Sequence, residues 1–169
     1  MEISQQHWDK TRKLFGDGTH ATASPALPYC AFATVDEDGS PRAAPYTSLI
    51  LNDKMRGFYF DEFSRNTSVN LDRDQKVCVL IVKSSRLFWF KTLVLGRFDH
   101  PPGIRLMGRV AEKREATEQE LNAFKKPLRS LRFFKGYKPI WGFMKHGREI
   151  DFHSFELVKC GSIKELESI

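Results

Sequence analysis

The stretch "GFYFDEFSRNTSVNL", residues 57–71, indicates most about the fold and the site of this chain. After Gly57 come three aromatic residues, which favour a β-strand. A dense group of small polar and charged side chains follows, and the stretch ends on apolar residues. Ser64 can cap a helix, with Asn66 and Thr67 in its first turn. Two interpretations follow: the polar group only caps a helix, or it also holds an anion.

The position of Arg65 favours an anion site. The N-terminal end of a helix is positive and disfavours a cation in the first turn. Its free backbone N–H groups bind anions, so an anion would explain the arginine. Arg42 begins the preceding predicted strand. If that strand pairs with the next one around "NDKMRG", Arg42, Arg65 and Thr67 converge on one phosphate. The alternative for Arg42 is a solvated charge at a strand end.

The rest of the chain reads mainly as β-strands joined by tight turns. Asp38-Gly39 is a strong hairpin signal, and Pro45 indicates an edge, a bulge or a strand end. Thr117 and Glu120 predict a capping box at the start of a helix. Strands are expected over 29–35, 42–51, 57–60, 76–83, 104–115 and 148–159, and helices over 3–15, over 64–72 and from 117.

These elements predict a mainly β protein, a small antiparallel barrel with peripheral α-helices. The first half of the chain after the N-terminal helix reads as an antiparallel meander. The strand at 76–83 is an uninterrupted apolar run, so we expect it to be buried on both faces or to close the barrel. We expect one domain over residues 1–169, with an N-terminal helix and linker over 1–20.

Composition narrows the class of protein further. The chain has 169 residues, a net charge of +6 and 14 Phe, which suggests a core or pocket built from aromatic faces. No apolar leader or spanning run is present, so we expect a soluble cytoplasmic protein with no membrane partner. Cys30 and Cys78 lie in apolar strands and are expected to be buried thiols, and no zinc spacing occurs, so no metal is expected.

Two further segments stand out. Residues 84–103 form an aromatic insertion that could cover a pocket or pack on a partner subunit. Residues 125–138 carry six basic side chains and no acidic one, which is typical of a solvated helix face. Phe133, Phe134 and Tyr137 interleave with these charges, but a nucleic-acid partner is not expected.

In sequence order, the segments "ATVDEDGSPRAAPYTSLIL", "GFYFDEFSRNTSVNL", "DQKVCVLIV" and "IRLMGRV" resemble the pyridoxamine 5′-phosphate oxidase-like FMN-binding split barrels, over residues 29–157. The resemblance implies an FMN cofactor and a homodimer with two cofactor sites at the subunit interface. It implies these cofactor-binding residues: Arg42, Ala44, Pro45, Tyr46, Thr47, Phe60, Asp61, Ser64, Arg65, Asn66, Thr67 and Asn70, completed by Arg105 and Trp141 of the second subunit.

The expected activity is that of a flavin-dependent oxidoreductase with a donor such as NAD(P)H. No catalytic acid or base is identified. Thr67 stands where many family members have a phosphate-binding lysine, and the C-terminus lacks the "RLHDR"-like ending of true pyridoxamine phosphate oxidases. The alternative is a non-catalytic carrier of flavin, deazaflavin or haem, although residues 42–71 contain no histidine that could bind haem iron.

Overall fold

The structure is a computed structural model that describes residues 4–15, 30–52, 54–83, 85–98 and 100–159. Most of the predicted linker lies outside these residues. The strands are β1 Cys30–Val35, β2 Pro41–Tyr46, β3 Ile50–Leu51, β4 Arg56–Phe60, β5 Lys76–Val82, β6 Gly103–Val110, β7 Arg114–Glu115 and β8 His146–Leu157. The helices are α1 Gln5–Phe15, α2 Arg65–Arg73, α3 Arg86–Leu95, α4 Glu118–Leu128 and α5 Tyr137–Trp141, with a 3-10 turn, η1, at Arg129–Leu131.

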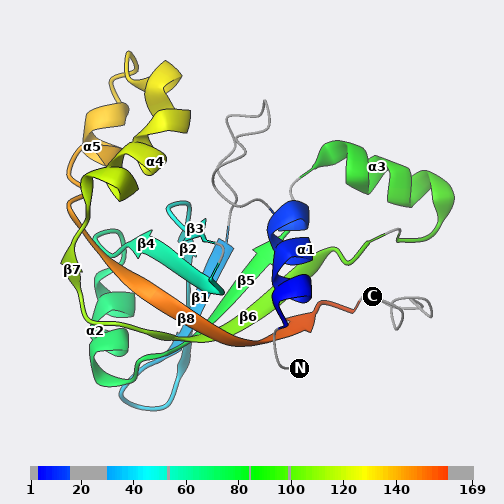
Figure 1. Cartoon of the computed structure of the whole chain (residues 1–169), viewed down its shortest axis with the longest axis horizontal. Coiled ribbons are helices and arrows are strands. Elements are labelled where there is room, and N and C mark those ends of the chain that lie inside the picture. The colour runs from blue at the N-terminus through cyan, green and yellow to red at the C-terminus, as the bar shows by residue number, and fades with distance from the viewer. Residues whose placement is uncertain (1–3, 16–29, 53, 84, 99, 160–169) are drawn as a thin grey trace.

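The strands form one antiparallel sheet in the order β2-β1-β5-β6-β8-β4-β3, with β7 paired to β8. The two ends of this order, β2 and β3, are joined only by residues 47–49. Such a link spans at most about 14 Å between the flanking Cα atoms. The sheet must therefore curl until its edges approach, and Figure 1 shows this half-barrel. The predicted mainly antiparallel, barrel-like fold is confirmed.

The predicted meander is correct at both of its hairpins, β1–β2 and β3–β4, and wrong for the continuous strand expected to join them. β1 and β2 pair in register from Cys30 with Tyr46 to Val35 with Pro41. Gly39 occupies the turn with a φ of 84°, which glycine adopts readily. The expected strand over 42–51 is broken after Tyr46, however. Its last two residues pair with β4 at the other edge of the sheet.

Alternation along the strands places the main core inside the curl. In β5, Val77, Val79 and Ile81 are buried, whereas Cys78 and Leu80 are only half-buried. Of the two alternatives expected for this strand, full burial on both faces is therefore not found: its second side is partly open. Trp8 of α1 is fully buried against the core and donates from Nε1 to the carbonyl oxygen of Asn52 at 2.6 Å.

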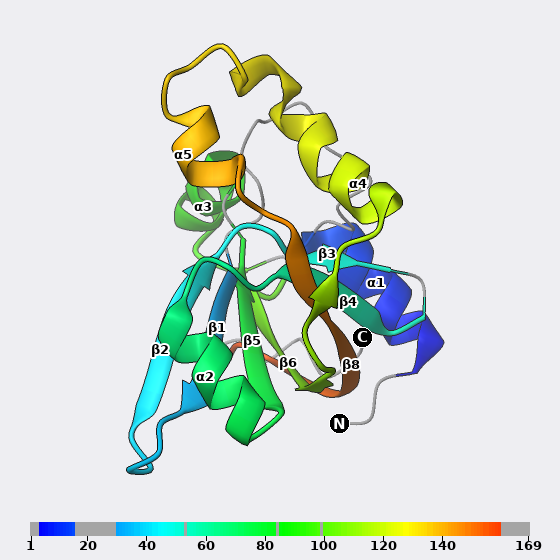
Figure 2. The same ribbon diagram turned by 90° about the vertical axis from the view of Figure 1, so that its left-hand side faces the viewer.

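A second, smaller core lies between β4 and α4. Phe60 packs on Phe124 with ring centroids 4.8 Å apart. The predicted capping box is confirmed, because Thr117 and Glu120 each bond the other's backbone N–H. Figure 2 shows α4 and α5 beyond one end of the sheet, while α2 lies beside β1 and β2. No helix in the described part of the chain is long and apolar enough to cross a membrane.

The aromatic insertion folds largely as α3. This helix begins after Ser85, whose side chain accepts a bond from the Phe88 N–H, and ends at Gly96 with a positive φ of 63°. None of its residues is buried. Figure 1 shows it projecting from the barrel beyond β5 and β6.

Candidate functional site

The N-terminus of α2 carries a group of hydroxyls. Ser64 is the N-cap, as the sequence predicted, and accepts a bond from the Thr67 N–H. The Ser64 and Thr67 hydroxyl oxygens lie 2.8 Å apart. Arg65 and Asn66, in the first turn, are exposed. The first backbone N–H groups of any helix lack partners within it, so this end offers amide, hydroxyl and guanidinium donors together.

The hydroxyl of Tyr46 is the third member of this group. The residue lies at the end of β2, is 2% exposed and stacks on Phe32 with centroids 4.4 Å apart. Its hydroxyl lies beside the hydroxyls of Ser64 and Thr67, yet no described residue bonds it with normal geometry. Burial raises the pKa of Tyr46 well above its ordinary value, so the hydroxyl remains a proton donor. A buried donor without a partner is costly and indicates a missing acceptor.

The other end of α2 is held by β1. Asn70 donates to the Thr34 hydroxyl at 3.1 Å and to the Asp36 carboxylate at 2.7 Å. Asp36 also forms an ion pair with Arg42. Hydrogen bonds from Asn70 and Arg42 lower the pKa of Asp36. Arg73 then donates to the carbonyl oxygen of Val35. Asn70 and Arg42 thus belong to a polar group that fastens the helix to the sheet.

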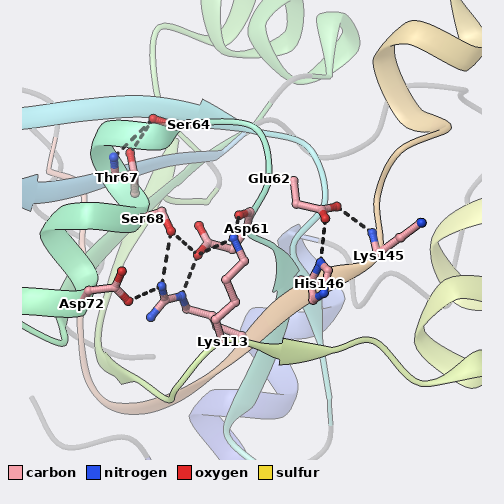
Figure 3. Close-up of polar contacts among 10 residues, drawn as sticks. Asp61, Glu62, Ser64, Thr67, Ser68, Asp72, Lys113, Lys145 and His146 are labelled. Atoms are coloured by element: carbon pink, nitrogen blue, oxygen red, sulfur yellow. Dashed lines mark hydrogen bonds and ion pairs between the residues drawn. The ribbon is translucent and has the colours of Figure 1, made fainter.

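A buried ion pair supports α2 from the side of β4 and β8. Asp61 and Arg148 are 1% and 2% exposed, and the Arg148 Nε donates to Asp61 Oδ2 at 2.6 Å. Ser68 of α2 donates to the same oxygen at 2.7 Å, and Asp72 accepts from Arg148. The Lys113 Nζ donates to the Asp61 carbonyl oxygen at 2.7 Å. Figure 3 shows these contacts converging where β4 meets α2.

Beside this network, Glu62 bonds the start of β8. Its carboxylate lies 2.9 Å from His146 Nδ1 and accepts the Lys145 N–H at 2.6 Å (Figure 3). A carboxylate at Nδ1 fixes the orientation of the imidazole. The pair ties the residue after Asp61 to the strand that carries Arg148.

The structure brings only part of the predicted site together. Tyr46, Ser64 and Thr67 meet, with Arg65 and Asn66 beside them on the same helix turn. The pairing expected around "NDKMRG" forms only between β3 and β4, so it does not bring Arg42 toward Phe60 and Asp61. Among the described strands, β2 pairs only with β1. Arg42 instead lies at the Asp36 and Asn70 end of α2.

The remaining predicted residues have other surroundings. Phe60 is fully buried in the second core, and Asp61 is engaged by Arg148. In β2, Ala44 is half-buried and Pro45 is exposed, and Thr47, just after the strand, is half-buried. Outside the α2 group lie the two residues assigned to the second subunit: Arg105, 3.2 Å from Glu156, and Trp141, whose ring is 5.8 Å from that of Tyr137.

Sequence reasoning missed Arg148, Lys113 and His146. One signal for Arg148 was present. In the alternating stretch "REIDFHSF" it shares a face with Ile150 and Phe152, which are buried. A charge on the apolar face of a strand requires a buried partner. No comparable pattern marks Lys113, which lies between β6 and β7.

The fold and this polar end define a class of protein, the split barrels in which a curled antiparallel sheet carries a helix after its fourth strand. Residues 18–156 match the family described as Pyridoxamine 5'-phosphate oxidase. The match covers most of the chain, which therefore belongs to this family. The resemblance seen in the sequence is confirmed. No protein of curated function matches the sequence.

Several solved structures share the fold. Group A Streptococcus HupZ has a TM-score of 0.56 at 19% identity, covering 94% of this chain and 96% of its own. An FMN-binding protein from Syntrophomonas wolfei subsp. wolfei has a TM-score of 0.56 at 16% identity, covering 92% and 95%. An F420 reductase has a TM-score of 0.54 at 12% identity, covering 86% and 94%. At these identities the likeness concerns the fold alone.

Proposed function

We propose that this protein binds FMN, with the phosphate at the N-terminus of α2, and acts as a flavin-dependent oxidoreductase. The observation that carries the proposal is the Tyr46 hydroxyl, which is buried within reach of the Ser64 and Thr67 hydroxyls but forms no hydrogen bond of normal geometry with any described residue. The donors gathered there are hydroxyls, an exposed guanidinium and free helix N–H groups. A phosphate dianion accepts from all three kinds of donor.

The chain's own residues would divide the work of holding this cofactor. Arg65 would pair with the phosphate, and Ser64 and Thr67 would orient it. Within the described part of the chain β2 pairs on one side only, so backbone donors on its other side would be available to the polar edge of the flavin ring. Bound FMN would supply the hydride-transfer chemistry. Family membership supports FMN, and one solved structure of this fold is an FMN-binding protein.

The proposal includes the homodimer that the family resemblance implies. β2 is an edge strand whose open hydrogen-bonding groups need a cover, and it carries small apolar residues. A cofactor, a second copy of the chain, or both together would supply that cover.

The experiment is to add FMN to the purified protein, desalt it and record the visible absorbance spectrum, then supply NADPH or NADH with an electron acceptor. Retained flavin bands and steady nicotinamide oxidation are the expected results. Retained flavin without turnover would make the protein a flavin carrier. A colourless protein that retains F420 instead, after the same treatment, would assign the site to a deazaflavin.

A further inference from the structure

Three buried polar atoms near α2 form no hydrogen bond of normal geometry with any described residue: the hydroxyls of Tyr46 and Tyr59 and the Oδ1 of Asp61. The three residues are 2%, 0% and 1% exposed. Buried polar groups are nearly always hydrogen-bonded, because an unpaired one is costly. The phosphate proposed for α2 accounts for the Tyr46 hydroxyl alone. The other two atoms need a further partner.

The fold gathers these three side chains around one ion pair. Tyr59 lies in β4 and Asp61 directly after it, two residues on, so their side chains share a face of the sheet. Tyr59 is also the register partner of Arg148 in β8, whose Nε donates to Asp61 Oδ2 at 2.6 Å. The ring of Tyr46 meets that of Tyr59 edge to face, with centroids 5.3 Å apart.

Both tyrosine hydroxyls lie in the field of the Asp61–Arg148 ion pair. Burial raises the pKa of Tyr46 and of Tyr59 well above the ordinary value, and the negative charge of Asp61 raises each pKa further. The positive charge of Arg148 acts on both in the opposite direction. Both phenols therefore keep their protons, and each can donate one hydrogen bond and accept others.

The charges around these atoms select a neutral partner. An anion would lie against the Asp61 carboxylate, and a cation would lie against the Arg148 guanidinium. Within the described part of the chain, no three His, Cys, Asp or Glu side chains gather where they could hold a metal ion. A water molecule can donate two hydrogen bonds and accept two, and a buried water typically makes about three with polar groups of this kind.

We propose that one ordered water molecule bridges Tyr46, Tyr59 and Asp61 and sets the direction of the Tyr46 hydroxyl. The water accepts from the Tyr59 hydroxyl and donates to Asp61 Oδ1 and to the Tyr46 oxygen. The single proton of Tyr46 then points away from the water, toward the start of α2. The water itself does not require flavin, whereas its effect on cofactor binding rests on the proposed FMN site.

Tyr59 and Asp61 are positioning residues in this arrangement, because they act on the phosphate through Tyr46. Without the Tyr59 hydroxyl, the water has an unused acceptor that the Tyr46 proton can fill. That proton then turns from the phosphate to the water. Binding of the phosphate is weakened, and binding of the flavin ring is not.

The first test is a high-resolution crystal structure of the protein without flavin. We expect an ordered water within about 3.2 Å of Asp61 Oδ1 and of both tyrosine hydroxyl oxygens. A direct hydrogen bond from either tyrosine to Asp61 Oδ1, or no water among the three atoms, would overturn the proposal.

A double-mutant cycle without flavin tests whether one water joins the two hydroxyls. Tyr46→Phe and Tyr59→Phe each remove one bond from the same water. We therefore expect the double variant to lose less free energy of unfolding than the two single variants lose in sum. Denaturant unfolding measures all three, and additive losses would contradict a shared water.

Titration with FMN and with riboflavin tests the effect on the cofactor site. Tyr59→Phe should lower the preference for FMN over riboflavin about threefold or more, as expected for one hydrogen bond. The control is Thr11→Val, which should leave the preference unchanged. It also removes a buried hydroxyl, since Thr11 is 6% exposed and donates to the His7 carbonyl oxygen within α1.

An unchanged preference in Tyr59→Phe would overturn the positioning role. A wild type that binds both flavins equally, or neither, would remove the FMN proposal and the positioning role together. The crystal structure and the double-mutant cycle would still decide the water, so the two proposals can fail separately.

Discussion

Arg148 and Asp61 form a charge pair that is almost wholly excluded from water. Breaking such a pair by removing one partner leaves the other charge buried and uncompensated. Ser68 and Lys113 surround Asp61 with further donors, although its Oδ1 has no partner among the described residues. Only half of this pair could be predicted from the sequence. The alternation of residues places Arg148 on a buried face, but its partner depends on which strands pair.

We predict that Arg148→Met lowers the free energy of unfolding by about 3–5 kcal/mol, because it strands the Asp61 carboxylate. Denaturant unfolding measures this. The control is Arg56→Met, whose guanidinium lies 2.6 Å from Asp151 but is 49% exposed, where an ion pair contributes about 1 kcal/mol or less. Equal losses in the two variants would contradict the role given to burial.

Arg65 tests the anion site at the same scale. We predict that Arg65→Ala weakens FMN binding tenfold or more, because a charge-assisted hydrogen bond contributes about 1.5–3 kcal/mol. Fluorescence titration of FMN measures the dissociation constant. Lys76→Ala removes one positive charge just beyond the other end of α2 and should leave the affinity within about twofold, as expected for screened, distant charges. Unchanged affinity in Arg65→Ala would remove Arg65 from the site.

At the scale of elements, the sequence predicted caps well and irregular strands poorly. The helix ends at Ser64 and Thr117 follow from local hydrogen bonding, which short motifs specify. The break after Tyr46 does not, because the choice between continuing along β1 and crossing to β4 depends on distant strands. α3 escaped prediction as a helix because its uniformly apolar residues show no helical period.

Helix α2 is predicted to couple stability to flavin binding through its cap. Ser64→Ala and Thr117→Ala should each lower the unfolding free energy by about 1 kcal/mol, since each removes an N-cap hydroxyl. Only Ser64→Ala should also weaken FMN binding, because only α2 is assigned the phosphate. Thermal unfolding and FMN titration of both variants measure the two effects. Equal FMN affinities of the two variants would show that the Ser64 side chain caps the helix without contributing to FMN binding.

Arg114 connects β7, α4 and β8. Its guanidinium donates to Glu120 at 2.7 Å and to Glu149 at 2.6 Å. Burial raises the pKa of Glu120, but hydrogen bonds from Arg114 and Thr117 outweigh it, so the pKa lies below its ordinary value. A lowered carboxyl pKa stabilises the fold above the ordinary pKa, and this contribution is lost as the pH falls through the lowered value.

We therefore predict that Glu120→Gln destabilises the protein at about pH 7 and that its difference from the wild type shrinks toward about pH 3. Denaturant unfolding across this range measures the difference. Glu118→Gln changes the same charge in the same helix turn, and the structure shows no bond from it to Arg114. A difference for Glu120→Gln that does not change with pH would contradict the assignment.

At the scale of the molecule, the mainly β, antiparallel barrel could be predicted because hairpin signals and alternating strands are local. The strand order of the sheet could not be predicted, because β2 and β3 are neighbours in the sequence but lie at opposite ends of that order. That separation also moved Arg42 away from the group it was expected to join. The hydroxyls at the start of α2 were found because they follow one another along the chain.

The proposed role of the N-terminus of α2 is to bind the phosphate of a flavin. The measurement that tests it most directly is a side-by-side titration of the protein with FMN and with riboflavin, which lacks the phosphate. We expect FMN to bind about tenfold or more tightly than riboflavin, the difference expected from one charge-assisted contact. Equal affinity for the two flavins, or no binding of either, would contradict it.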